Sequence, residues 1–465
     1  MFILDAINAF TNWLWGIPML IWIVGGGLYL SIRLGFLQFT KLGFILKNTI
    51  GKSFGKKEKK EGFSSFQALT GALASTLGAG NIIGTAMAIA FGGPGGVFWL
   101  WVSGLVCCCV KYAEVTMSMK YRRLDPDGNW EGGPQIYLTE GTGWKWISPL
   151  YAVICIVCLF LAASAQIGSG VDNLETLGAP RLASTIILTV LAAVVVIGGM
   201  KSLLTVTEKL VPFMAIIYMI GALIVIVLNA GAIPGAIGAI FASAFTGHAA
   251  VGGFVGSTFA LAVRWGVARG CYSNDSGTGV TTIVHAVAEV NHPIQQSMWG
   301  VFEVFFDTIV VCTMTCLVVL TTGVWQLDVA PAVMTATGFT QTIGPIGGII
   351  VTIAVVLFTF TTACAQIEFT VAQFAKLIND KTSTKNTCRW IMIALIFVGG
   401  IVGIGALIAY VDFFAGLYTL VNLLGVYWCT NQIVALTKEY FDDPQKWETT
   451  MWKPWADMKA RFGKK

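Results

Sequence analysis

The stretch Ala74-Ser-Thr-Leu-Gly-Ala-Gly-Asn-Ile-Ile-Gly84 interrupts a long apolar segment that runs from Leu69 to Val102. Its three glycines weaken a helix interior, because glycine loses more backbone entropy on ordering than any other residue. Asn81 adds an amide to a segment that otherwise suits lipid, where polar groups are rarely tolerated. A helix broken halfway across a membrane explains both features, because its free N–H groups can bind an anion and its free carbonyls a cation. A close helix crossing built on small residues is the alternative.

The composition of the whole chain is that of a membrane protein with many spans. Of its 465 residues, 56% are hydrophobic and 11% are charged, and the mean hydropathy is +0.76. Soluble domains contain about 25% charged residues. The formal net charge of +5 is small and does not suggest nucleic-acid binding. Nearly all of the 11 cysteines lie in apolar runs, which favours packing over metal binding or disulfides. The N-terminus lacks the basic region of a cleavable signal peptide.

We expect an all-α polytopic membrane protein with about eleven transmembrane helices of about 20 apolar residues each. Their approximate bounds are residues 7–32, 65–91, 97–119, 149–169, 182–200, 204–228, 257–290, 296–323, 346–374, 390–408 and 412–436. A second break is expected in the seventh span, at Arg269-Gly-Cys-Tyr-Ser-Asn-Asp-Ser-Gly-Thr-Gly279. The chargeless connection over residues 230–256 is expected at the membrane surface.

The two broken spans are five apart, which indicates an inverted repeat. Residues 1–64 form an extra N-terminal span and a basic cytoplasmic loop, residues 65–229 the first five-helix repeat, and residues 257–437 the second. The connection over residues 230–256 is extracytoplasmic, and residues 438–465 are a cytoplasmic tail. Five is an odd number, so the repeats cross in opposite directions and their broken helices meet at the midplane. Lys and Arg concentrate in the loops after odd-numbered spans, which places the N-terminus outside and the C-terminus in the cytoplasm.

Two motifs resemble the alanine/glycine:cation symporter family. The first is Gly71-Ala-Leu-Ala-Ser-Thr-Leu-Gly-Ala-Gly-Asn-Ile-Ile-Gly84 with Gly92-Gly-Pro-Gly-Gly-Val-Phe-Trp99, and the second is Gly266-Val-Ala-Arg-Gly-Cys-Tyr-Ser-Asn-Asp-Ser-Gly277 with His285-Ala286. The resemblance covers about residues 63–431. It implies the five-plus-five fold of neurotransmitter:sodium symporters. It also implies uptake of small neutral amino acids such as alanine or glycine, with Na⁺ as coupling ion and no organic cofactor.

The chain departs from the family's pattern in two functional regions. Ala363-Cys-Ala-Gln-Ile-Glu368 stands where an aromatic-rich run is usual, and Gly170-Val-Asp-Asn173 places Asp172 near a position where the family often has glutamine. These departures leave the identity of the substrate open.

An amino acid zwitterion needs N–H donors for its carboxylate and oxygen acceptors for its ammonium. The first break offers the backbone donors, and the second break offers carbonyl acceptors, with Asp172 as a further acceptor. An alternative use of Asn81 with Thr76 is a second cation site that touches the substrate carboxylate. The expected substrate-binding residues are Thr76, Gly78, Ala79, Gly80, Asn81, Asp172, Tyr272, Ser273 and Asn274.

Sodium is a hard cation that takes oxygen ligands. Thr361 and Thr362 in the ninth span resemble the paired hydroxyls of the sodium site in the shared fold. The resemblance adds the carbonyls of Ala74, Leu77 and Phe358 as ligands. The alternative for both threonines is a hydrogen bond to the preceding turn of their own helix.

The buried charges need partners, because an unpaired charge at the bilayer centre costs about 2.5–3.5 kcal/mol or more. Lys111 and Glu114 are three residues apart and are expected to pair. Arg269 and Asp275 are expected to pin or gate the second break. Their possible partners are Glu289, Glu303, Asp307 and Glu368, and a proton relay through such carboxylates is the alternative. His285 is expected to be structural, and the tail tryptophans to lie at the inner membrane interface.

Three functions were compared on these grounds. A sodium-coupled symporter of the plasma membrane needs only the amino acid, the ion and the bilayer, with no obligatory protein partner evident. The same fold with proton coupling or another amine substrate is the second hypothesis. An intramembrane enzyme is the third, because Gly168-Ser-Gly170 superficially resembles a membrane protease motif. No histidine lies at comparable depth in a neighbouring span, and no nucleotide-binding loop is present, so we expect a transporter and not an enzyme.

Overall fold

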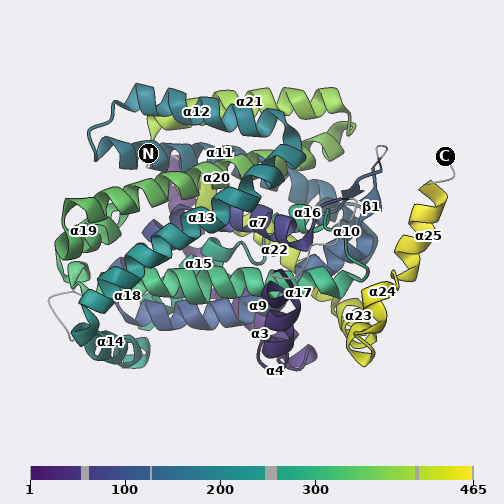
Figure 1. Ribbon diagram of the computed structural model, residues 1–465, viewed down its shortest axis with the longest axis horizontal. Helices are drawn as coiled ribbons and strands as arrows, with labels where there is room; N and C mark the ends of the chain where they lie inside the picture. Colours follow the sequence, from purple (N-terminus) through teal and green to yellow (C-terminus); the bar gives the residue numbers. More distant parts are fainter. Residues whose placement is uncertain (1, 54–61, 126–127, 247–258, 404–407, 463–465) are drawn as a thin grey trace.

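The computed structural model describes residues 2–53, 62–125, 128–246, 259–403 and 408–462. These residues form a bundle in which most long helices run along one direction, horizontal in Figure 1. A short antiparallel ribbon, β1 (Arg123–Leu124) with β2 (Trp130–Glu131), is the one sheet in the described part of the chain. The prediction of an all-α fold is therefore confirmed.

Eight described helical runs are long and apolar enough to cross a membrane. Six are α9 (Gly95–Tyr121), α11 (Ile147–Glu175), α13 (Gly199–Leu228), α20 (Pro345–Ile378), α21 (Thr382–Val402) and α22 (Ile408–Trp428). Two are composite: α1 (Phe2–Leu14), α2 (Ile17–Met19), η1 (Leu20–Gly25) and α3 (Gly26–Arg33), and α17 (Pro293–Val304), η4 (Phe305–Cys312) and α18 (Thr313–Thr321). A bent helix pair adds a ninth, and α12 (Arg181–Ile197) is shorter, so the count of eleven stays a prediction.

The first predicted break is confirmed. Helix α7 (Ser65–Thr76) begins at a capping box formed by Ser64 and Gln67, and ends where Leu77 leaves the helical region. The chain resumes as a wide helical turn, η2 (Gly80–Gly84), and continues as α8 (Thr85–Gly92). The two halves are bent by 56°.

The second predicted break is also confirmed, with a shorter inner half than expected. Helix α15 (Phe259–Asn274) ends in a loop where Asp275, Gly277 and Gly279 have positive φ angles of 51°, 90° and 77°. Helix α16 (Thr282–His285) then forms a single turn. The predicted helical continuation to residue 290 is wrong, because residues 286–287 form a turn and Ala288 forms a β-bridge with Phe63.

The broken helices lie inside a layer of continuous ones. Helix α9 packs along α15 and α17, α11 along α20, α21 and α22, and α13 along α7 and α20. The crossing of α9 and α15 depends on glycine, because a Cβ at Gly266 would lie 2.3 Å from the carbonyl oxygen of Gly96. Both breaks are thereby held at the centre of the molecule (Figure 1).

The loops contain more helix than the sequence indicated. The connection after α13 holds η3 (Ala230–Ala232) and α14 (Ile233–Thr246), and residues 247–258 of it lie outside the described residues. The other loop helices are α4 (Leu37–Thr40), α5 (Leu42–Asn48), α6 (Ile50–Ser53), α10 (Pro134–Thr142), η5 (Val324–Gln326) and α19 (Pro331–Ile343). The C-terminal region forms α23 (Thr430–Asp442), α24 (Lys446–Thr449) and α25 (Lys453–Phe462).

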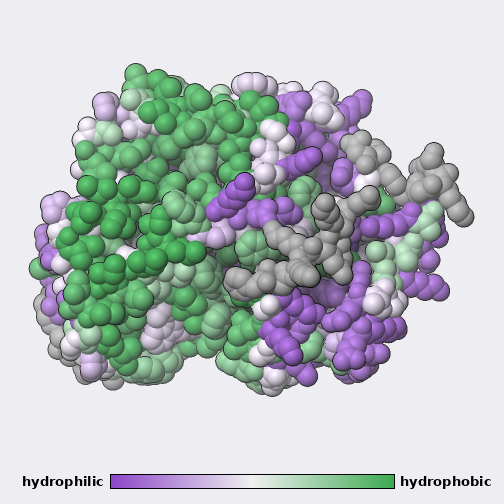
Figure 2. All heavy atoms as spheres, viewed as in Figure 1, coloured by the Kyte–Doolittle hydropathy of each residue, from purple (hydrophilic) through white to green (hydrophobic). Residues whose placement is uncertain are grey.

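The surface divides into an apolar belt and a polar end. Figure 2 shows apolar residues over most of the visible face and polar ones gathered at the end that carries α10 and α23–α25. Large apolar side chains such as Ile187 and Val194 on α12 and Val227 on α13 are exposed. The tail tryptophans differ from the prediction, because Trp447 and Trp455 are buried against the protein instead of facing an interface with lipid.

Candidate functional site

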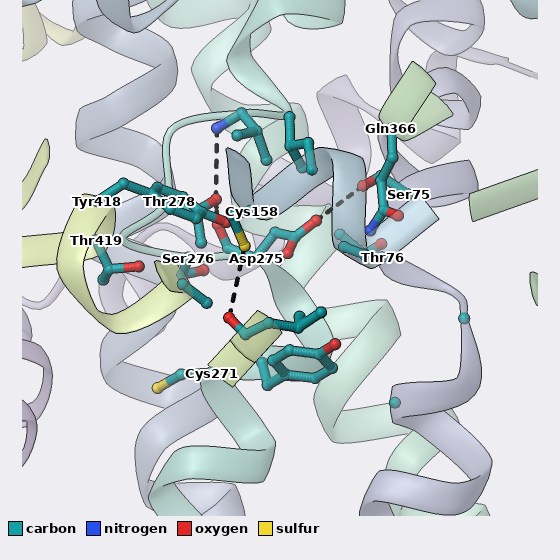
Figure 3. Close-up of a pocket in the computed structure, with 18 of the residues that line it drawn as sticks. Ser75, Thr76, Cys158, Cys271, Asp275, Ser276, Thr278, Gln366, Tyr418 and Thr419 are labelled. Atoms are coloured by element: carbon teal, nitrogen blue, oxygen red, sulfur yellow. Dashed lines mark hydrogen bonds between the residues drawn. The ribbon is translucent and has the colours of Figure 1, made fainter. Parts of the chain in front are cut away.

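A small cavity joins the two breaks, and we call it the break pocket (Figure 3). Its volume is about 40 Å³, which is room for about three water molecules. The breaks, α11, α20 and α22 supply most of its wall. The lining residues are Trp15, Ser75, Thr76, Gly78, Gly80, Cys158, Leu159, Ala162, Gln166, Cys271, Tyr272, Asp275, Ser276, Thr278, Val280, Gln366, Val411, Ala415, Tyr418 and Thr419.

The first break brings backbone groups to the wall of this pocket. The Gly78 N–H is 2.9 Å from the Thr76 carbonyl and 3.0 Å from Asn81 Oδ1. The Ala79 N–H has a long contact, 3.5 Å, to Gln166 Oε1. Gly78 and Gly80 line the pocket, and a Cβ at Gly80 would be 3.4 Å from Ser273 Cα across the gap. The first break therefore approaches the second closely through glycine.

The second break contributes a partly buried carboxylate. Asp275 lines the pocket, and its Oδ2 accepts a hydrogen bond of 2.9 Å from Ser75 of the first break. Lys111 on α9 donates to the Asp275 carbonyl at 3.1 Å and to Thr281 Oγ1 at 2.7 Å. The lysine thus spans both ends of the second break and places a positive charge near the carboxylate.

A second carboxylate, that of Asp307 in η4, accepts hydrogen bonds from both breaks, although Asp307 does not line the pocket. Its oxygens accept from Asn81 Nδ2 at 2.6 Å, Ser273 Oγ at 2.7 Å and Thr308 Oγ1 at 3.0 Å. Asp307 is fully buried, and within the described ranges no Lys, Arg or His lies at ion-pair distance from it. The sequence indicated Asp307 only as a partner for the second break. Its position as the lone acidic residue in 304–323 was the available signal.

Asn81 and Ser273 lie together as predicted site residues, whereas Asn274 faces elsewhere. Asn81 Nδ2 is 2.9 Å from Ser273 Oγ, and both reach Asp307. Asn274 donates to Thr308 Oγ1 at 2.9 Å and accepts from the Ser276 N–H, so its side chain supports the break and does not line the pocket. Tyr272 does line it.

The five predicted sodium ligands divide into two groups. Thr362 Oγ1 is 2.9 Å from the Ala74 carbonyl and 3.3 Å from the Leu77 carbonyl, at the end of α7. Thr361 Oγ1 donates within its own helix, to the carbonyls of Leu357 at 3.1 Å and Phe358 at 3.0 Å. Thr362 thus lies at the first break. Thr361 instead forms a hydrogen bond to the preceding turn of its own helix, which was the alternative interpretation for both threonines.

Asp172 lies outside the break pocket. It sits near the end of α11, where its carboxylate is 34% exposed and forms an ion pair of 2.7 Å with Arg181. It is nearly two helical turns beyond Gln166, the α11 residue that does line the pocket. The predicted role of Asp172 as an acceptor for the substrate ammonium therefore has no geometric support.

The charge pairing differs from the prediction. Lys111 pairs with Glu303 at 3.5 Å, while Glu114 accepts from Asn422 at 2.6 Å. Arg269 pairs with Asp412 at 3.0 Å and with none of the expected acids. Lys111 and Arg269 each pair with an acid on another helix. The spacing of charges along one helix could not predict such partners.

The remaining expected partners are also occupied. Glu368 holds Arg389 at 2.8 and 2.9 Å, and Glu289 holds Lys459 at 3.1 Å. His285 is fully buried, with Nε2 2.8 Å from Glu303 Oε2 and Nδ1 2.8 Å from Gln296. The expected structural role of His285 agrees with these contacts.

The whole chain was also compared with known proteins. The model of the sodium:alanine symporter family matches residues 1–453. The transporter YflA of Bacillus subtilis is 37% identical over 444 residues, 94% of either chain. The sodium/alanine symporter AgcS of Methanococcus maripaludis is 34% identical over 451 residues, 94% of this chain and 97% of AgcS.

The chain belongs to the sodium:alanine symporter family. This family member is an integral membrane transporter and not an enzyme. Its fold is also that of a solved transporter, MhsT in complex with L-phenylalanine, with a TM-score of 0.59 at 15% identity over 79% of this chain and 89% of MhsT. The fold of neurotransmitter:sodium symporters expected from the motifs is thereby confirmed.

Proposed function

We propose that this family member couples the entry of Na⁺ to the uptake of a small neutral amino acid, such as alanine or glycine, by alternating access. The observation that carries the proposal is the break pocket, where Gly78 and Gly80 of one broken helix and the partly buried Asp275 carboxylate of the other line the same cavity. A zwitterion has the complementary arrangement of charges. Such substrate sites usually lie near the bilayer midplane.

The substrate carboxylate binds near the N–H groups of Gly78, Ala79 and Gly80, where the dipole of the second half-helix favours negative charge. The ammonium binds at Asp275, with carbonyls of the second break as further acceptors. The small apolar wall is supplied by Leu159 and Ala162 on α11, and by Val411 and Ala415 on α22. A long side chain has little room against this wall, which supports a small substrate.

The coupling sodium binds at the end of α7, to the Ala74 and Leu77 carbonyls and the Thr362 hydroxyl. Their mutual distances of 2.9 and 3.3 Å support this position, because three oxygens already converge there. Phe358 and Thr361, one helical turn or less away on α20, complete the ligand set after a rotation of the Thr361 hydroxyl. Carbonyls at a helix end are free for a cation because no helical N–H follows them.

A second coupling ion at Asp307 is the alternative that one observation favours. A fully buried carboxylate without a basic partner in the described part of the chain needs a cation or a proton to be stable. Proton coupling, or a second sodium that also contacts Asn81 and Ser273, would satisfy this need. Thr76, the expected partner of Asn81 in a second cation site, lines the pocket and forms no hydrogen bond with Asn81, Ser273 or Asp307.

The proposed orientation in the plasma membrane has the N-terminus outside and the C-terminus in the cytoplasm. The polar end of Figure 2 supports it, since lysine- and arginine-bearing loops that follow odd-numbered spans gather there with the C-terminal helices.

Uptake into proteoliposomes tests the function directly. Purified full-length protein should accumulate radiolabelled alanine when sodium is higher outside than inside, and the rate should fall to the level of empty vesicles when potassium replaces sodium. A proton gradient imposed without sodium separates the two coupling ions. Accumulation that is indifferent to both gradients would refute coupled transport.

A further inference from the structure

Among the described residues that line the break pocket, four have a side-chain oxygen without a hydrogen-bond partner, and these are Thr76, Ser276, Gln366 and Thr419. Gln366 on α20 is 8% exposed, and its Oε1 accepts no hydrogen bond. An exchange of the amide oxygen and nitrogen would leave a donor unpaired in place of an acceptor. In either orientation, the carboxamide faces the pocket with unused hydrogen-bonding capacity, which is costly for a buried polar group.

Thr76 lies on the same side of the pocket as Gln366 (Figure 3). The Thr76 hydroxyl lines the pocket, is 2% exposed as a residue and has no partner. Figure 3 shows Gln366, Ser75 and Thr76 on one side of the pocket, with Asp275 between them and the Tyr418 and Thr419 side. Ser75 is already engaged with Asp275 at 2.9 Å. Gln366 and Thr76 therefore form a polar subsite next to the position assigned to the ammonium.

The zwitterion alone cannot pair with all four unpaired side-chain oxygens, because its ammonium has three N–H donors and one of them is assigned to Asp275. The substrate carboxylate needs donors, which the first break supplies, and the ammonium has the Asp275 carboxylate. An apolar methyl group against Gln366 and Thr76 would leave both groups unpaired in a closed site. A hydroxyl on the substrate would both donate and accept, and so satisfy an amide and a threonine hydroxyl together.

We propose that Gln366, with Thr76, reads a hydroxyl group on the substrate side chain, so that this transporter prefers serine among small amino acids. The proposal rests on the proposed uptake function and specifies its substrate. The proposal commits to serine because its side chain is the shortest that supplies both a donor and an acceptor, whereas the amide of glutamine would need a longer side chain. The motifs that carry the family resemblance do not predict this preference. Gln366 lies in residues 363–368, where the chain departs from the aromatic-rich run that is usual in the family.

Serine and 2-aminobutyrate provide a matched pair of ligands, because a hydroxyl in one replaces a methyl in the other at equal heavy-atom count. Both compete with radiolabelled alanine for sodium-driven uptake by the full-length protein in proteoliposomes. Serine should inhibit at a concentration about 10-fold or more lower than 2-aminobutyrate, since a site with buried polar groups discriminates against a ligand that leaves them unpaired. The Gln366→Leu variant should bring this ratio close to one or invert it.

Gln373→Leu is the control, because Gln373 is a buried glutamine on the same helix with an unpaired Oε1 but does not line the pocket. Its ratio should match that of the wild type. Equal inhibition by both ligands in the wild type, with alanine uptake intact, overturns the proposal and leaves the transport function standing. Equal inhibition is also the result expected if Gln366 contacts only the ammonium. The comparison of the two ligands in the wild type therefore distinguishes the two roles without a variant. A glutamine preference would likewise overturn it, and loss of sodium-driven uptake of every amino acid would refute the transport function itself.

Discussion

Asp275 combines two unusual properties at the scale of a single residue. Its φ angle of 51° lies in the left-handed region, which non-glycine residues rarely adopt and which aspartate tolerates better than most. The same residue places a partly buried carboxylate at the break pocket, where it accepts a hydrogen bond from Ser75. The backbone conformation that ends α15 thus also presents the acid to the first break, so that the fold and the proposed ammonium site depend on the same position.

Asp275→Asn tests the role of this carboxylate in binding the ammonium. Loss of the negative charge should raise the alanine concentration for half-maximal uptake about 100-fold, because charge-assisted hydrogen bonds are among the strongest. Asp172→Asn is the matched control and should change it less than about threefold, since Asp172 pairs with Arg181 outside the pocket. Similar transport by both variants would remove Asp275 from the site.

Thr362→Ala and Thr361→Ala test the sodium position. Removal of the Thr362 hydroxyl, which lies against the first break, should raise the sodium concentration for half-maximal uptake about 10-fold. Removal of the Thr361 hydroxyl, which bonds its own helix, should have a smaller effect. The measurement is the sodium dependence of alanine uptake at fixed membrane potential. An unshifted curve for Thr362→Ala would place the ion elsewhere.

At the scale of the elements, each break is a helix end held inside the molecule by a continuous helix. Helix α9 supports the second break through Lys111, and α20 supports the first through Thr362. The glycine spacing and Asn81 were sufficient to predict where the helices break, because backbone propensity is local. The partners of Lys111, Arg269 and Asp307 could not be predicted, because they lie on other helices whose rotation depends on packing of the whole bundle.

Gly266→Ala tests the close crossing of α9 and α15 that positions the second break. A Cβ there would lie 2.3 Å from the Gly96 carbonyl oxygen, so the helices must separate. We expect a loss of about 1–3 kcal/mol in stability, visible as a lower midpoint of thermal unfolding in detergent, together with reduced uptake. Gly238→Ala on α14, with open space around its Cβ position, should leave the midpoint unchanged. A wild-type midpoint for Gly266→Ala would contradict this packing.

At the scale of the whole molecule, the C-terminal helices pack at the polar end against the segment that follows the second break. The Arg122 guanidinium lies 4.0 Å from the Trp130 ring and 3.8 Å from the Trp455 ring, and donates to the Ala286 carbonyl at 3.0 Å. The Trp452 N–H donates to the Asn291 carbonyl at 2.7 Å. These contacts join the end of the chain to the segment that follows α16, which the sequence did not predict because the tail tryptophans suggested an interface with lipid.

His292 makes this end of the molecule sensitive to acid. Burial and the nearby Lys446 lower the pKa of His292 from 6.5 to about 3, although Glu439 lies 4.0 Å away at the surface. The unfolded chain binds this proton below about pH 6.5 while the folded protein does not, so stability should fall as the pH drops from 6.5 towards 3. At pH 5 the loss should be about 1–2 kcal/mol.

Thermal unfolding of the wild type and His292→Gln at pH 7.5 and pH 5 measures this effect. The variant should show a smaller difference between the two pH values, because its amide does not titrate in this range. Equal pH dependence in both proteins would assign the acid sensitivity to other groups. The contacts of His292 with Trp447, at 4.5 Å between ring centroids, and with Tyr440, at 5.2 Å, identify the region that should loosen first.

The most direct test of the central claim is a high-resolution cryo-electron microscopy structure of the full-length protein in lipid nanodiscs with sodium and a saturating transported amino acid. We predict ligand density between the two breaks, with its carboxylate at the N–H groups of Gly78–Gly80 and its ammonium at Asp275, and an ion at the Ala74 and Leu77 carbonyls. Ligand density elsewhere in the molecule, with no ligand between the breaks, would contradict the account.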